Sequence, residues 1–149
     1  TEWMDKIDGV LTDGREALDA FRTVARRAGE EIDAISPSLE RTVADAAQTA
    51  QQLKLASIEV RRAPWRLLYR PSDRELEHEL LYDAARSFAL AAADLRGTAE
   101  TVDRVLTRNA EFLQGDPARA ERLRALLGDS LERYEVAQQR LFTILANEP

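Results

Sequence analysis

Apolar and small residues recur every three or four positions along most of this chain. Intervals that alternate between three and four average close to 3.5 residues, the period of a left-handed coiled coil. The first run extends from about residue 3 to residue 62 and is carried by Trp3, Ile7, Val10, Gly14, Ala17, Phe21, Val24, Ala28, Ile32, Ile35, Leu39, Val43, Ala46, Ala50 and Leu53.

This run predicts one long helix over residues 3–62. Pro37 interrupts it, because a proline inside a helix removes a backbone donor and clashes with the preceding turn. The steps between apolar positions also depart slightly from a strict heptad around Pro37. No glycine flanks Pro37 to permit a reversal, so we expect a kink or a short break there and not a hairpin.

A hinge over residues 63–72 follows, and a second helix is predicted over residues 73–113. The residue before Pro71 is disfavoured from the helical region, which ends any turn that begins at Pro64. Ser72 and Glu75 then have the spacing of a capping box ahead of an apolar run.

A third helix is predicted over residues 117–146. It follows Gly115-Asp116-Pro117, in which Gly115 suits a left-handed helix end, Asp116 an N-cap and Pro117 the first helical position. Together these patterns predict an all-α chain, a single helical region over residues 1–149. Three long, antiparallel, coiled-coil-like helices would pack as a hairpin or an elongated bundle.

The predicted helices differ in length, which leaves part of the first one without a partner. At 1.5 Å per residue they are roughly 90, 60 and 45 Å long. Packed as one hairpin bundle, the second helix would cover only the C-terminal two thirds of the first. Apolar stripes left uncovered usually mark interaction surfaces. We therefore expect an assembly or lipid-facing stripe formed by Trp3, Met4, Ile7, Val10, Leu11 and Leu18.

Composition narrows the possible partners. The formal net charge is −6, which argues against nucleic acid, since binding phosphates requires a positive surface. The chain has no cysteine, so it forms neither disulfides nor thiolate metal sites. No apolar run reaches the roughly 20 residues needed to span a bilayer. The chain starts inside a helical pattern, and we expect a fragment whose N-terminal anchor or export signal has been removed.

Two local patterns are reminiscent of catalytic or metal sites. Gly128-Asp129-Ser130-Leu131 matches the four-letter motif of an esterase class, but it lies inside a helical pattern and no histidine follows it. His78 is the only histidine, and with Glu75 it forms one half of a di-iron motif that requires two such pairs. We expect no catalytic residue, no metal site and no cofactor, and therefore not an enzyme.

The hinge combines aromatic residues, arginines and prolines. In one interpretation its apolar side chains pack against the end of the helix pair, and the arginines donate hydrogen bonds to the carbonyl oxygens at the helix C-termini. In another it contacts lipid headgroups, because amphipathic aromatics with arginine suit a membrane interface. Stacking on RNA fits least well with the negative charge. The hinge set consists of Pro64, Trp65, Arg66, Leu67, Leu68, Tyr69, Arg70 and Pro71.

The hinge, continued by Ser72, Glu75-Leu76 and residues 81–89, resembles the C-terminal helical region of MlaD-like proteins with a mammalian cell entry (MCE) domain. The resemblance covers about residues 61–95. It implies a substrate-binding component of an ABC-type lipid transporter in the periplasm or cell envelope of a Gram-negative bacterium. Such components are anchored to the inner membrane by an N-terminal helix, form hexamers, and work with a permease and an ATPase.

The expected function follows from this resemblance. No segment alternates as a strand would, so the chain would be the helical tail without its MCE domain. It would mediate assembly of the oligomer or extend a lipid conduit without catalysing a reaction. The alternative is a structural coiled-coil spacer, or a protein-interaction module, that binds no lipid.

Overall fold

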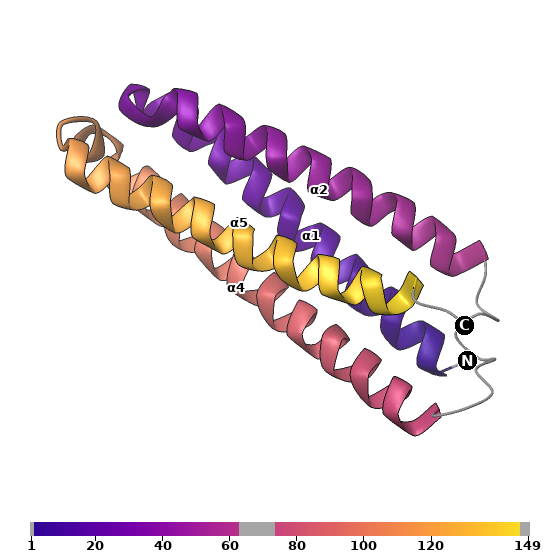
Figure 1. Ribbon diagram of the computed structural model, residues 1–149. Coiled ribbons are helices and arrows are strands. Elements are labelled where there is room, and N and C mark those ends of the chain that lie inside the picture. Colours follow the sequence, from indigo (N-terminus) through magenta and orange to yellow (C-terminus); the bar gives the residue numbers. More distant parts are fainter. Residues whose placement is uncertain (1, 63–73, 147–149) are drawn as a thin grey trace.

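The computed structural model describes residues 2–62 and 74–146, so the hinge set lies outside the described residues. The described part is helical, and no strand occurs in it (Figure 1). Its elements are α1 (Glu2–Glu31), a short 3-10 turn η1 (Asp33–Ile35), α2 (Ser36–Arg62), α4 (Arg74–Gln114) and α5 (Pro117–Ala146).

The chain reverses between α1 and α2, so the prediction of one kinked helix over residues 3–62 is wrong. Ile32 adopts an extended conformation (φ −124°, ψ 93°), and η1 turns the chain back along α1. Pro37 falls in the first turn of α2, where a missing backbone N–H has no intrahelical acceptor to lose. The described residues thus form four long helices, not three.

The second and third predicted helices, residues 73–113 and 117–146, agree with α4 and α5 to within a residue. Asp116 caps α5 as expected: its Oδ1 accepts from the backbone N–H groups of Ala118 (3.1 Å) and Arg119 (3.3 Å). Near the end of α4, Asn109 leaves helical geometry (φ −138°, ψ 26°), which marks a kink.

The helices form two antiparallel hairpins, α1–α2 and α4–α5, laid side by side so that α1 runs parallel to α4 (Figure 1). Close contacts join α1 to α2, α1 to α4 and α4 to α5, whereas α2 and α5 meet more sparsely. Both turns lie at one end of the bundle. There the Asp33 N–H donates to Gln114 Oε1 (3.0 Å), and Gln114 Nε2 donates to Asp33 Oδ2 (3.2 Å).

Ion pairs fix the parallel register of α1 and α4. Arg27 of α1 pairs with Asp103 of α4, and Arg96 of α4 pairs with Glu16 of α1 at 3.3 Å. Exposed pairs of this kind add little stability. Their value is geometric, because they hold the first turns of both helices at the same end of the bundle.

Aromatic rings fill the middle of the core. The rings of Phe88 and Tyr134 pack with centroids 5.1 Å apart, and Tyr134 Oη donates to the carbonyl oxygen of Gly14 at 3.0 Å. A Cβ at Gly14 would collide with the Phe88 ring. Glycine is therefore the residue that lets α1 approach these two rings.

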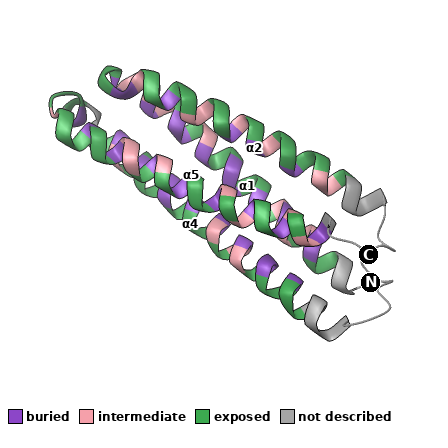
Figure 2. Ribbon diagram, in the orientation of Figure 1, coloured by how far each residue is buried: buried purple, intermediate pink, exposed green. Residues whose placement is uncertain are grey.

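The expectation that the first helix is uncovered does not hold for four residues of the predicted stripe. Ile7, Leu11 and Leu18 are buried in the core, and Val10 is half-buried against it. Figure 2 shows the buried positions along the inward faces of the helices. The chain reversal places α2 along α1, and α4 starts at the same end as α1, so these two neighbours cover Ile7, Leu11 and Leu18.

No helix in the described ranges combines the length and the apolar character needed to cross a membrane.

Candidate functional site

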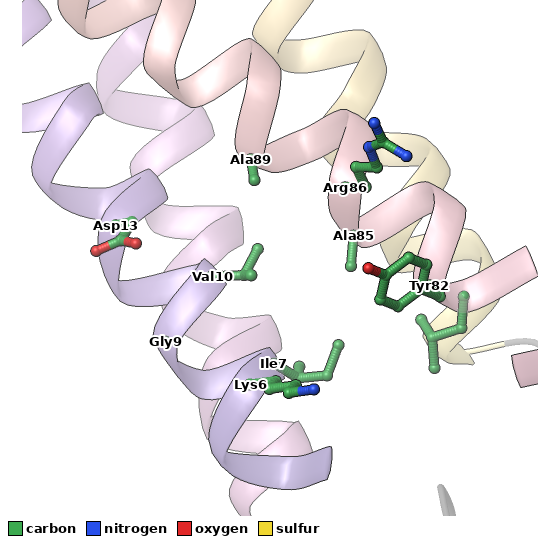
Figure 3. Close-up of a pocket in the computed structure, with 10 residues that line it drawn as sticks. Lys6, Ile7, Gly9, Val10, Asp13, Tyr82, Ala85, Arg86 and Ala89 are labelled. Atoms are coloured by element: carbon green, nitrogen blue, oxygen red, sulfur yellow. The ribbon is translucent and has the colours of Figure 1, made fainter. Parts of the chain in front are cut away.

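An apolar groove lies between residues 6–13 of α1 and residues 81–89 of α4 (Figure 3). It is near the end of the bundle opposite the two turns (Figure 1). Its volume is about 440 Å³, within the range of about 300–1,000 Å³ typical of small-molecule pockets. Ile7 and Val10 form the wall on α1, and the wall on α4 is formed by Leu81, Ala85 and Ala89.

Small side chains keep this groove open. Gly9 presents no side chain on α1, and a Cβ built there would meet no atom within 4 Å. Ala85 and Ala89 are one turn apart on α4 and face α1 (Figure 3). Bulky residues at these three positions would fill the space, as Phe21 and Phe88 do deeper in the core.

The edges of the groove carry both charge signs with an excess of cations. Lys6 extends from α1 toward α4, Arg86 borders the groove on α4, and Asp13 lies on α1 (Figure 3). Within residues 2–62 and 74–146, no ion pair joins Lys6 or Arg86 to a carboxylate. An apolar trough bordered by cations suits a ligand with a hydrocarbon chain and an anionic group.

Two of the six residues of the predicted stripe contribute to this groove. Ile7 and Val10 line it, whereas Leu11 and Leu18 belong to the core. The side chains of Trp3 and Met4 lie outside the described part. Of the predicted stripe, the structure therefore places only Ile7 and Val10 in the groove, where they face the wall formed by α4.

The α4 wall was not predicted as part of a site. Leu81, Tyr82, Ala85, Arg86 and Ala89 fall in residues 81–89, which carried the family resemblance but no assigned role. One local signal was present: Tyr82 and Arg86 are four residues apart, so they share one helix face beside the small residue Ala85.

Ser130, in the esterase-like motif, holds two helices together. It is fully buried in α5, and its hydroxyl donates to Asp94 Oδ2 of α4 at 3.2 Å. Arg133 donates to the same oxygen from Nε (3.2 Å) and Nη2 (2.9 Å). The serine lies in the middle of a helix, without the exposed strand-to-helix turn on which such nucleophiles stand.

In the part of the chain that the structure describes, no three His, Cys, Asp or Glu side chains come together in a way that could hold a metal ion. Comparison with known proteins gives no further indication: no family model, no curated protein and no solved structure matches the chain.

Proposed function

We propose that this chain is the non-catalytic helical tail of an MlaD-like, MCE-type component of a lipid ABC transporter. The groove between α1 and α4 receives the hydrocarbon part of a lipid. The observation that carries this function is the apolar trough of Ile7, Val10, Leu81, Ala85 and Ala89, with Lys6 at its edge.

The segment that resembles the MCE proteins supplies one wall of the groove. Residues 81–89 belong to that segment, and Leu81, Tyr82, Ala85, Arg86 and Ala89 line the groove. This overlap supports reading the groove as the part of the helical tail that contacts lipid. Each buried methylene of an acyl chain contributes about 0.8 kcal/mol, so even partial burial of the chain gives useful affinity.

The same proposal places the protein in the cell envelope of a Gram-negative bacterium. An N-terminal part anchors it to the inner membrane and reaches the permease and the ATPase, and the copies form a hexamer as in the family. Since Ile7, Leu11 and Leu18 are buried, contacts between copies use outward-facing apolar residues. Leu55, Leu90 and Val136 are each more than half exposed and serve this purpose.

Filling the groove tests this function. Ala89→Phe adds a ring to the α4 wall, and we expect binding of a fluorescent fatty acid, cis-parinaric acid, to weaken at least about tenfold, a loss of about 1.4 kcal/mol. The matched control is Ala93→Phe, one turn along the same helix at an exposed position that does not line the groove. It should bind like the unmodified protein. Equal binding by both variants, or none by the unmodified protein, would refute a lipid groove.

A structural coiled-coil spacer remains the second candidate. It is favoured by the ion pairs that join neighbouring helices, Arg27–Asp103 between α1 and α4 and Arg140–Asp83 between α4 and α5. Such a spacer binds only protein. The unmodified protein would then take up no cis-parinaric acid while keeping its helicity.

A further inference from the structure

Helices α2 and α5 meet along a polar seam at the least extensive helix–helix contact of the ring. Thr49 of α2 and Gln138 of α5 are buried there, and half-buried Glu135 faces Thr49. Beside them lies a groove of about 450 Å³ whose lining includes Asp45. Because α2 packs less extensively on α5 than on α1, this seam is the edge along which α2 is held most weakly.

The polar groups of the seam include more hydrogen-bond acceptors than protons to share among them. Thr49 Oγ1 lies 2.8 Å from the carbonyl oxygen of Asp45 and 3.0 Å from Glu135 Oε1. A hydroxyl has one proton and can donate to only one of these two acceptors. Gln138 Nε2 donates to the carbonyl oxygen of Thr49 at 3.3 Å, and Gln138 Oε1 is buried without a partner in the described residues. Acceptors therefore outnumber donors.

The electrostatics of the seam favour a neutral Glu135. Burial raises the pKa of the Glu135 carboxyl, and the nearby carboxylates of Asp45 and Glu132 raise that pKa further, against the opposing hydrogen bond from Thr49. Asp45 comes from α2 and Glu132 from α5 itself. Among the described residues that line the groove there is no lysine or arginine.

We propose that Glu135 carries a proton while α2 is packed on α5, and that this proton fastens the two helices together. The Glu135 hydroxyl donates to Thr49 Oγ1, and the Thr49 proton goes to the carbonyl oxygen of Asp45. Every short distance around Thr49 is then a hydrogen bond. Ionisation of Glu135 removes one donor and adds a negative charge beside Asp45 and Glu132, and α2 loosens from α5 while it stays packed on α1.

The direction of the pH dependence follows from the raised pKa. The packed seam binds a proton that the open seam releases, so packing is fully favoured below the ordinary pKa of glutamate. It weakens as the pH rises from that value through the raised pKa of Glu135. A single proton changes the packing equilibrium by at most about tenfold per pH unit. This switch is independent of lipid binding in the groove between α1 and α4.

The absence of cysteine from the chain permits a direct distance measurement. Gln51→Cys on α2 and Thr143→Cys on α5 are exposed positions outside the seam and accept spin labels. Double electron–electron resonance should give one narrow distance distribution at about pH 4, below the ordinary pKa of glutamate, and a growing population of longer distances as the pH is raised toward about 8.

Two charge-matched variants separate the roles of the carboxylates. In the labelled protein, Glu135→Gln keeps a donor toward Thr49, so the distribution should stay narrow at both pH values. Glu132→Gln removes the same charge but keeps Glu135, so the distribution should still broaden as the pH rises. A pH-independent distribution in the protein with Glu135, or a Glu135 carboxyl ¹³C shift that titrates at or below the ordinary pKa of glutamate, would overturn the switch.

Discussion

Gly14 determines how closely α1 approaches the aromatic core. Its carbonyl oxygen accepts the Tyr134 hydroxyl, and the space beside its Cα is occupied by the Phe88 ring. The three-and-four spacing of apolar and small residues placed Gly14 at a core position. It could not show which aromatic ring fills the space beside Gly14. That detail depends on two helices distant in sequence, α4 and α5, meeting at this point.

We predict that Gly14→Ala destabilises the protein by about 1–3 kcal/mol, because the added methyl forces the Phe88 ring away from its position. Thermal or urea unfolding followed by circular dichroism measures this change. Gly97→Ala is the control, since a Cβ at Gly97 meets no atom within 4 Å. It should stabilise the protein by up to about 1 kcal/mol through helix propensity. Equal effects at both glycines would contradict the close approach at Gly14.

At the scale of the helices, the sequence predicted where α4 and α5 begin and end but missed the reversal after α1. The ends of α4 and α5 carry local chemistry, such as the Asp116 cap, that can be recognised in a short window. The apolar period, in contrast, continues through the turn with only a slight departure, because Ile32, Ile35 and Leu39 are all buried at helical spacing. A periodic pattern reports that residues are buried, not on which side of a turn their partners lie.

The cap of α5 can be tested in the same way. We predict that Asp116→Ala destabilises the protein by about 1 kcal/mol, because two backbone N–H groups at the start of α5 lose their acceptor. Asp116 also pairs with Arg119 at 3.3 Å. Asp116→Asn removes the charge of that pair but keeps an acceptor oxygen for the cap, so a comparable loss in this control would contradict the capping role.

At the scale of the whole molecule, neither the groove nor the arrangement of the helices within the bundle could be derived from single-helix patterns. The groove requires α1 and α4 to start side by side in parallel, although Ile7 and Leu81 are far apart in the sequence. Nothing in the apolar period of either helix specifies that neighbour. The sequence therefore predicted Ile7 and Val10 as important apolar residues but paired them with another molecule instead of with α4.

The bundle consists of two helical hairpins, and we expect each to associate with the other without the connecting chain. We predict that separate polypeptides of residues 1–62 and 74–149 form a one-to-one complex when refolded together, since α1 and α4 pack closely and share ion pairs such as Arg27–Asp103. Sedimentation would detect the complex, and circular dichroism would show more helix than the sum of the separate pieces. Two species that sediment independently would contradict this interpretation.

The reciprocal contact of Asp33 and Gln114 has a mechanical consequence. It ties the hairpins at one end of the bundle, and the groove lies at the other, about 25 residues or about 40 Å along α1. Between these two ends α1 and α4 also pack on each other, through Phe88 at Gly14 and the Arg96–Glu16 ion pair, so the walls at Ile7 and Leu81 are held at a fixed spacing. A ligand of the groove would therefore enter from its open side, without any separation of the two hairpins.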